Sequence, residues 1–519
     1  MFVSVLVPAI SAGDEGLTAA ETVEALARTA WTVGAQTHAA WELLVAAPER
    51  SVGALAARLD ALGLPSPWRL TLLPRPADDD LAVSLRAASE AAAGSWLTVL
   101  DPGDEYVPHT LEALLAATGP RTDLVYGDEV DPQDAEGAYR KPQWSPSFLL
   151  GHPYLGHPVL MRSEAVAAAG GFDPASGVAA EWDLLLRLSA LAREVNSVPR
   201  LLAQTRVRSA DRWTAAARCA ARAAVERHLE RLAVPAAVTA LDDPWQLRVA
   251  PQVRDMPSVS VVIPTAGQQR ELRGEQTELV VNALRSIARH TAGVDWRPVV
   301  VLGEGEPAGL RDRIIEAAGR PVTFVLRPGR FNFAGAVNEG VLAADGEFVL
   351  LLNDDTQVED DAWLPELLGW AQQPGVGAVG PKLLFEDGSI QHVGVCLGPD
   401  GLPTHMYLRA PDEGDHRGAL TTAAERLAVT GACLLVRRAA YLAAGGFCLD
   451  FPLNFNDVDF CLKLRDLGLR SVVVPHVRLT HFESSTRTPK LTETEVALYR
   501  ELWGHLERDP FFDVQDRHD

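Results

Sequence analysis

Short apolar runs rich in Val, Leu and Ile alternate with longer amphipathic stretches along most of the chain. The run at residues 3–8 ends in Pro and precedes a helical pattern. A second apolar run and more helix then lead to a third run, at 96–100, which ends in acids. Runs that are apolar at every position are typical of strands buried on both faces, and their alternation with helices predicts a mostly parallel sheet. Because ligands bind beyond the carboxyl ends of such strands, these acids lie where a ligand is expected.

The same layout occurs twice in the chain. Four pairs of segments match in the same order: VSVLVP (3–8) with VSVVIP (259–264), AGSWLTVLDPGD (93–104) with DGEFVLLLNDDT (345–356), LMRSEAVAAAGGF (160–172) with LVRRAAYLAAGGF (435–447), and EWDLLLRLSALA (181–192) with DVDFCLKLRDLG (457–468). The spacing between the copies drifts only slowly and is the size of a domain. The repeat therefore indicates a tandem duplication, not a solenoid.

The length of 519 residues is too great for one ordinary core, which also predicts two domains. An Ala/Arg-rich helical pattern at 210–234 and a Pro-containing stretch separate the copies. We predict domains at 1–208 and 257–519, joined by a helical linker at 209–256. The segment VALYRELWGHLERDPFF predicts an amphipathic C-terminal helix in the second domain.

Composition narrows the function classes. The formal net charge of −22 argues against a nucleic-acid partner, which needs a basic face. The five Cys residues form no CxxC pair, and we expect buried free thiols in a reducing compartment. The N-terminus lacks the basic region of a signal peptide, and no apolar run is long enough to span a bilayer. We expect a cytoplasmic protein, with peripheral docking on the inner face of the membrane left open.

The first candidate chemistry is the sequence Asn353–Asp354–Asp355, directly after an apolar run. Oxygen ligands at a strand end suit Mg²⁺ or Mn²⁺, and such an ion can bridge a diphosphate. The alternative is a polar turn that caps the next helix.

A second acidic group opens a predicted helix. Asn456 fits an N-cap and Asp459 the third helical position of a capping box. The start of a helix favours a negative charge at position 457 but does not require this residue in particular. Asp457 is therefore the carboxylate that is available for a functional role.

Two further segments have open interpretations. His481 ends a β-like run, and a lone His is more often structural or solvated than a metal ligand. FNFAGAVNEG (331–340) either lets backbone N–H groups approach phosphates or makes a tight helix–sheet contact.

Together these segments resemble family 2 glycosyltransferases, which have the GT-A fold. The second copy resembles rhamnosyltransferase-like members almost end to end, through VSVVIPT, FNFAGAVNEG, LLLNDDTQV, GAVGPKLLFEDGSIQHVGV, VTGACLLVRRAAYLAAGGF, FNDVDFCLKLRDLG and LTHFESS. The first copy is similar through LDPGDEYVPHTLEAL, DLVYGDEVD, YRKPQWSPSFLL and AAAGGFD. The resemblance implies two tandem GT-A domains and an inverting, metal-dependent enzyme. It would move a hexosyl or deoxyhexosyl group from a UDP- or dTDP-sugar to a hydroxyl of a cell-surface polysaccharide or lipid-linked glycan.

The resemblance also implies roles for individual residues. Asp355 and His481 would bind Mg²⁺ or Mn²⁺, and Asp457 would be the catalytic base. The remaining implied positions would contact the nucleotide-sugar donor: Pro264, Thr265, Glu304, Asn332, Asn338, Asn353 and Asp354. One base without an enzyme nucleophile implies a single displacement with inversion.

Departures from the family pattern define the alternatives. The second copy has Gly303 where the family usually ends a strand with Asp. The first copy departs at several positions together: Ala46 and Ala47 at the same strand end, Gly103 at the metal-binding Asp, Glu181 at the base, and Gln204 and Thr205 in place of the His. We therefore expect a degenerate first domain. A non-catalytic glycan or nucleotide-sugar scaffold is the alternative function. A Rossmann oxidoreductase is disfavoured because no GxGxxG follows either opening strand.

Overall fold

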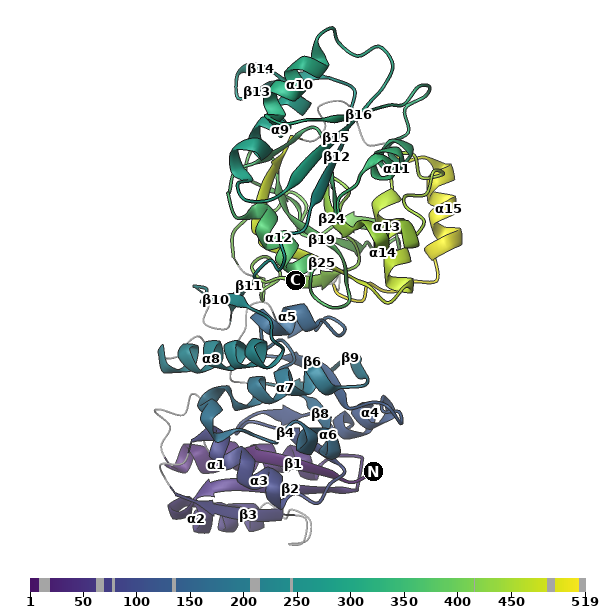
Figure 1. The fold of residues 1–519 in the computed structure, drawn as a ribbon. Helices are drawn as coiled ribbons and strands as arrows, with labels where there is room; N and C mark the ends of the chain where they lie inside the picture. Colours follow the sequence, from purple (N-terminus) through teal and green to yellow (C-terminus); the bar gives the residue numbers. More distant parts are fainter. Residues whose placement is uncertain are drawn as a thin grey trace. The chain divides into compact units, whose positions relative to one another are not determined.

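The computed structural model describes residues 1–8, 19–61, 70–76, 80–132, 137–205, 215–242, 246–414, 416–482 and 491–512. These residues form two compact units with the boundary between Leu247 and Arg248. The boundary predicted at 208–209 and the end of the LTHFESS segment lie outside the described residues. Each unit consists of a sheet with helices on both faces (Figure 1).

The first unit contains the helices and strands of the first sequence copy. Its strands are β1 (Val3–Pro8), β2 (Trp41–Pro48), β3 (Leu70–Arg75), β4 (Trp96–Val99), β5 (Glu105–Tyr106), β6 (Leu124–Val130), β7 (Ala138–Tyr139), β8 (Val159–Arg162), β9 (Val195–Gln204) and, near the boundary, β10 (Ala236–Ala240). Its helices are α1 (Ala19–Gly34), α2 (Glu49–Ala61), α3 (Leu81–Ala91), α4 (Thr110–Ala116), α5 (Pro146–Gly151), α6 (Ser163–Ala168), α7 (Ala180–Leu191) and α8 (Ala215–Arg231). The Ala/Arg-rich stretch is thus helical, as predicted, and α8 packs on α7.

The second unit repeats this arrangement. Its strands are β11 (Leu247–Pro251, across the boundary), β12 (Val259–Thr265), β13 (Gln269–Leu272), β14 (Glu275–Glu278), β15 (Trp296–Leu302), β16 (Thr323–Leu326), β17 (Phe348–Leu352), β18 (Thr356–Val358), β19 (Val376–Leu384), β20 (Ile390–His392), β21 (Val395–Leu397), β22 (Pro403–His405), β23 (Ala424–Arg426), β24 (Cys433–Arg437) and β25 (Arg470–His481). Its helices are α9 (Leu279–His290), α10 (Leu310–Ala318), α11 (Phe333–Ala343), α12 (Trp363–Ala371), α13 (Arg438–Ala443), α14 (Asn456–Asp466) and α15 (Glu493–Trp503).

The two central sheets have the same strand order. It is β3-β2-β1-β4-β8-β6-β9-β5 in the first unit and β16-β15-β12-β17-β24-β19-β25-β18 in the second. The first four strands of each order run parallel, and β8 and β24 pair antiparallel with their neighbours. This identity of order confirms the duplication predicted from the sequence and the mixed, mostly parallel α/β class.

The core of the second unit lies between its sheet and the helices on each side. Helices α9 and α12 lie on one side of the sheet, and α11, α13 and α14 lie on the other (Figure 1). Every residue of β12 and β17 is buried; β17 is apolar throughout, and β12 is apolar except for Ser260 and Thr265. Helix α11 lies very close to the sheet at Gly340, where an added Cβ would lie 2.4 Å from Val262 Cγ1. This close approach supports the helix–sheet interpretation of the 331–340 segment.

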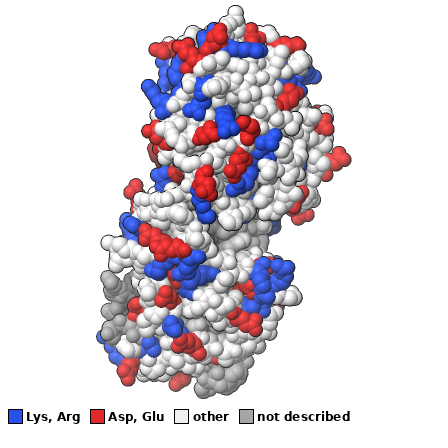
Figure 2. Space-filling model, viewed as in Figure 1, with Lys and Arg blue, Asp and Glu red and all other residues white. Residues whose placement is uncertain are grey.

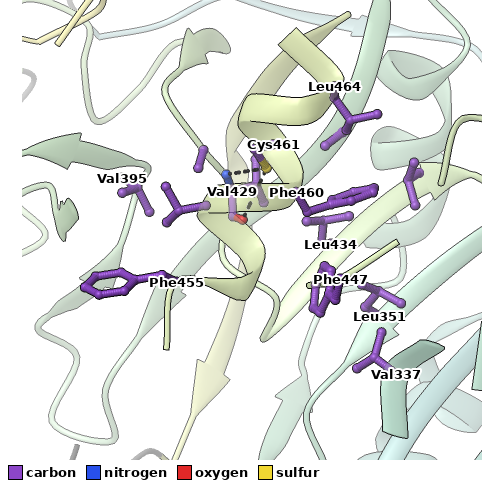
Figure 3. Packing of buried hydrophobic residues seen from close by; sticks show 14 of the residues in the cluster. Val337, Leu351, Val395, Val429, Leu434, Phe447, Phe455, Phe460, Cys461 and Leu464 are labelled. Carbon is purple, nitrogen blue, oxygen red and sulfur yellow. Dashed lines mark hydrogen bonds between the residues drawn. The ribbon is translucent and has the colours of Figure 1, made fainter. Parts of the chain in front are cut away.

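Helix α14 is held against the sheet by an aromatic cluster and by a thiol. Phe447 and Phe460 pack with Leu351 and Leu434 (Figure 3). The Cys461 thiol lies 3.5 Å from the Val429 backbone nitrogen, which donates to it (Figure 3). These contacts fix the start of α14 next to the segment that leads into β24. Cys396, Cys433 and Cys461 are buried free thiols, as expected, whereas Cys219 is exposed.

On the face shown in Figure 2, basic and acidic side chains are interspersed on both units. Among the described helices, none combines the length and the apolar character needed to cross a membrane.

Candidate active site

The Asn353–Asp354–Asp355 sequence directly follows β17, beside the end of β12. These strands are parallel neighbours, so their carboxyl ends meet at one edge of the sheet. The Thr265 hydroxyl donates a 2.6 Å hydrogen bond to Asp354 Oδ2, and the same hydroxyl oxygen accepts from the Gly267 backbone N–H. Thr265 and Pro264 are buried at this edge, and their contact with a donor stays a prediction.

Strand pairing brings Asp355 and His481 together from distant parts of the chain. Strand β18 pairs antiparallel with the end of β25, with Thr356 opposite His481. The Phe482 N–H donates to the Asp355 backbone oxygen, and His481 Nε2 lies 2.9 Å from Asp355 Oδ1. The two predicted cation ligands are therefore neighbours in the structure.

The hydrogen bonds of His481 leave Nε2 directed at the acids. Nδ1 lies 2.6 Å from Gln391 Oε1, which can only accept, so Nδ1 carries a proton. Nε2 also lies 3.3 Å from the Asn353 amide nitrogen. Nε2 faces Asp355 Oδ1, so it either donates a proton to that carboxylate or offers its lone pair to a cation bound between them.

A divalent cation fits this group of side chains. Within the described residues, the Oδ1 atom of Asn353 is buried and has no hydrogen-bond partner. Together with Asp355 Oδ1 and His481 Nε2 it offers oxygen and imidazole ligands that suit Mn²⁺ or Mg²⁺. The orientation of His481 by Gln391 is the outer-shell contact typical of metal-binding histidines.

The pKa values of the adjacent residues Asp354 and Asp355 are shifted in opposite directions. Burial and the neighbouring charge of Asp355 raise the pKa of Asp354 above its ordinary value. Burial opposes ionisation of Asp355 as well, but His481 outweighs it and lowers the pKa of Asp355. A bound cation would therefore offset the repulsion between the Asp354 and Asp355 carboxylates.

Asp457 is the second residue of α14 and is half-buried. Its Oδ2 accepts a 2.8 Å hydrogen bond from the Gly431 N–H, and its Oδ1 accepts from the Val458 N–H. Two backbone N–H groups therefore hold the carboxylate beside the segment that leads from Gly431 into β24.

The predicted capping box at this helix is wrong. The N-cap is Phe455, in a left-handed conformation with φ 60°, and Asn456 is the first helical residue, its amide donating to the Phe451 oxygen. Asp459 instead accepts from the Trp503 indole at 3.1 Å and pairs with Lys463 at 2.8 Å. Packing of Phe455 on Tyr499 of α15, with ring centroids 5.0 Å apart, holds this conformation in place of a polar cap.

Asp457 and the Asn353–Asp355 group are hydrogen-bonded to two adjacent residues, Gly431 and Ala432. The Gly431 N–H holds Asp457, and the Ala432 oxygen accepts from the Asn353 N–H at 3.0 Å. Because β24 pairs with β17, this short segment lies across the end of β17. Both groups therefore lie at the same edge of the sheet.

Three other residues are predicted to contact the nucleotide-sugar donor, and their surroundings differ. Asn332 caps α11 through the Gly335 N–H, and Asn338 exchanges hydrogen bonds with the Phe447 backbone and Tyr441. These contacts give both residues structural roles. Glu304 is exposed just beyond the end of β15. Contact of these three with a donor stays a prediction.

Sequence reasoning missed three residues of these sites. Gln391 and Gly431 lie within segments that carry the family resemblance, but neither spacing nor residue type marked them. His157 was also missed, because no His was found at the strand end that corresponds to His481. The structure instead brings His157 from the start of β8 to the acids of the first unit, where ligand atoms of Asp101, Asp104 and His157 all lie within 4.8 Å of one another.

Two models of one family match the chain. The model described as glycosyl transferase family 2 matches residues 4–171, and the model described as glycosyltransferase like family 2 matches residues 257–501. The chain therefore belongs to glycosyltransferase family 2 and carries two such domains in tandem, each with the GT-A fold.

Similarity extends to longer proteins. The chain is 31% identical over 511 residues to the O-antigen biosynthesis protein RfbC of Myxococcus xanthus, which covers 93% of this chain and 38% of the relative. It is 30% identical over 502 residues to the uncharacterized protein y4gI of Sinorhizobium fredii, covering 92% and 53%. The chain thus spans about half or less of the length of these relatives.

Two shorter similarities complete the comparison. An N-acetylglucosaminyl-diphospho-decaprenol L-rhamnosyltransferase of Mycobacterium tuberculosis is 29% identical over 155 residues, covering 27% of this chain and 48% of the relative. The crystal structure of GalNAc-T7 with UDP, GalNAc and Mn²⁺ is 15% identical, covers 51% of each chain and has a TM-score of 0.38.

Proposed function

We propose that the second unit transfers a hexosyl or deoxyhexosyl group from a UDP- or dTDP-sugar to a hydroxyl of an acceptor, with inversion. One observation carries this proposal: the Gly431 N–H donates to Asp457, and the oxygen of the next residue, Ala432, accepts from the Asn353 N–H. The names of the RfbC and rhamnosyltransferase relatives support a polysaccharide or lipid-linked glycan as acceptor. A cytoplasmic location is part of the proposal.

The roles follow from the contacts of each side chain. Asp355, His481 and Asn353 would hold Mg²⁺ or Mn²⁺. When bound, such an ion stabilises the negative charge of a departing diphosphate. Asp354, fixed by Thr265, would contact the donor at the end of the same strand. Asp457 would take the proton of the attacking hydroxyl, whose own pKa is far above neutral. One base and no enzyme nucleophile give a single displacement, which inverts the anomeric centre.

The test compares Asp457→Asn with a matched variant in the first unit. Sugar release or transfer is measured over a panel of UDP- and dTDP-sugars with Mn²⁺. Asp457→Asn should lower the rate about 10²–10⁴-fold, the usual contribution of a general base. Glu181→Gln, the corresponding position on α7, should leave the rate unchanged. If wild type and Asp457→Asn behave alike while both bind the nucleotide, the protein is a binding scaffold and the proposal fails.

A further inference from the structure

A β-hairpin made of β13 and β14 follows the end of β12 in the second unit (Figure 1). Its turn, Arg273–Gly274, has φ angles of 52° and 88°, the left-handed values that suit a tight hairpin. The Leu279 N–H donates to the Gln268 oxygen at 3.1 Å and closes the hairpin onto α9. Leu272 and Leu279 also form a buried cluster with Phe482, which follows β25. The hairpin therefore joins the end of β12 to the end of β25.

The hairpin begins beside the Asp354 carboxylate. Thr265, the last residue of β12, donates to Asp354 Oδ2 and accepts from the Gly267 N–H. Gly267 has φ 67°, and an added Cβ would lie 2.6 Å from Leu310 Cδ2, so this turn requires glycine. The start of the hairpin is thus fixed at the edge of the sheet where the acids lie.

Arg270 of β13 reaches the residue that follows His481. Its Nη1 donates a 2.6 Å hydrogen bond to the Phe482 backbone oxygen, 212 residues later in the chain. The Phe482 N–H in turn donates to the Asp355 backbone oxygen at 2.9 Å. A single residue therefore connects the half-buried guanidinium to the backbone of a proposed cation ligand.

The charge of Arg270 acts on the acids of this edge. Burial opposes ionisation of Asp355, but His481 lowers the pKa of Asp355, and the charge of Arg270 adds to that lowering. A positive guanidinium and the two acids thus lie at one edge of the sheet. A diphosphate that extends from a cation at Asp355 toward the end of β12 would pass along the hairpin.

The first sequence copy lacks a basic residue at the corresponding place. Its stretch between β1 and α1, residues 9–18, reads AISAGDEGLT and contains no Lys or Arg. The second copy has Arg270 and Arg273 between β12 and α9. The first copy also has Gly103 where the second has Asp355. The basic residue and the aspartate are therefore present together in one copy and absent together in the other, as expected if both serve the donor.

The chemistry of the proposed reaction suits a guanidinium at this position. The acceptor oxygen bonds to the anomeric carbon and gives its proton to Asp457, while the bond from that carbon to the diphosphate oxygen breaks. The electron pair of the broken bond stays on the diphosphate, which gains negative charge. A guanidinium is permanently charged, and its planar N–H donors match phosphate oxygens. Such a group stabilises the departing diphosphate more than the bound donor.

We propose that Arg270 binds the diphosphate of the nucleotide-sugar donor beside the proposed divalent cation and stabilises it as the leaving group. The proposal rests on the function proposed for the second unit. The hairpin is then the wall of the donor site between the end of β12 and the end of β25.

The test measures the binding of UDP, dTDP and inorganic pyrophosphate to the full chain by calorimetry with saturating Mn²⁺. Arg270→Gln keeps an amide donor for the Phe482 oxygen but removes the charge. Its affinity for each diphosphate that the wild type binds should fall about 10–100-fold, the usual effect of losing a charged hydrogen bond. Arg273→Gln is the matched control, because Arg273 is 61% exposed on the same hairpin and pairs with Glu359. Its affinity should stay within about twofold of the wild type.

Binding of Mn²⁺ alone separates this role from a structural one. Loss of a positive charge near Asp355 should leave the Mn²⁺ affinity unchanged or raise it, as measured by electron paramagnetic resonance. An Arg270 that only fastens Phe482 would instead disturb His481, so that Mn²⁺ and diphosphate affinities fall together.

That joint fall would overturn the proposal, as would equal diphosphate affinity for wild type and Arg270→Gln. The function of the second unit fails on a different result. If the wild type binds pyrophosphate but neither UDP nor dTDP, the proposed donor is wrong, while the pyrophosphate comparison still decides the role of Arg270.

Discussion

The orientation of single side chains decides what the acids of the second unit can do. Asp355 and His481 become neighbours through strand pairing, but the direction of the imidazole is set by Gln391, which is 2% exposed. Its amide oxygen holds the proton on Nδ1 and so leaves Nε2 for the ligand side.

Replacing Gln391 should weaken cation binding without unfolding the unit. Gln391→Leu removes the acceptor for His481 Nδ1, and Mn²⁺ affinity should fall about 10–100-fold, as is usual for the loss of an outer-shell partner. Gln391→Glu keeps an acceptor and should retain most of the affinity. Calorimetric titration with Mn²⁺ measures both, and equal affinity for wild type and Gln391→Leu would remove Gln391 from the site.

His228 should make the first unit sensitive to mild acid. It is buried on α8, and burial, with the nearby Arg231, lowers its pKa to about 4, below the unfolded value of about 6.5. A lowered histidine pKa means that the unfolded chain binds the proton first, so stability falls as the pH drops from 6.5 toward 4. Between pH 7 and 5 the loss should be about 2 kcal/mol. His228→Gln should flatten this slope in urea unfolding curves, whereas an unchanged slope would assign the sensitivity to other groups.

At the scale of elements, α15 holds the start of α14 and with it the position of Asp457. Tyr499 packs on Phe455, the Trp503 indole donates to Asp459, and Glu495 accepts from the Asn454 backbone. All three contacts come from the C-terminal helix to the first turn of α14 or the residues just before it. The amphipathic helix predicted at the C-terminus therefore packs on its own unit.

Trp503→Phe tests this arrangement. The ring is kept but the indole donor is lost, which leaves buried Asp459 with one hydrogen bond fewer and should cost about 1–3 kcal/mol. A displaced α14 should also lower the transfer rate. Leu502→Ala is the matched control, because Leu502 is 43% exposed on the same helix and its loss should change stability by less than about 0.5 kcal/mol. Thermal unfolding and rate measurements that show no difference between the two variants would contradict the role of α15.

The sequence predicted the elements better than the contacts between them. Strands such as β12 and β17 were predictable because burial on both faces requires mostly apolar residues, which form an unbroken run in β17 and a run interrupted by Ser260 in β12. The cap of α14 was mispredicted, since its local polar residues fit a capping box while the decisive partners, Tyr499 and Trp503, lie some forty residues later. His157 was missed for a similar reason: it reaches Asp104 only through the pairing of β8 and β4.

At the scale of the molecule, each unit is built around its own sheet. The large apolar cluster of the second unit and both of its acidic groups lie after Arg248. This separation predicts that a fragment starting at residue 248 folds by itself. It should unfold in one cooperative transition by circular dichroism, and its Mn²⁺ binding free energy should match that of the full chain within about 0.5 kcal/mol. A fragment that is soluble but does not unfold cooperatively would show that the first unit is needed for folding.

The pairing of β18 with β25 is only three residues long. Side chains alternate between the two faces of a strand, so one residue inserted between Asp355 and Thr356 would keep the ladder but turn the aspartate away from the imidazole. Insertions in the loops between these strands would leave the pair facing each other. Natural versions of this domain should therefore vary in length in the segments between β18 and β25. Residues 353–356, which join β17 to the middle of β18, should not vary in number.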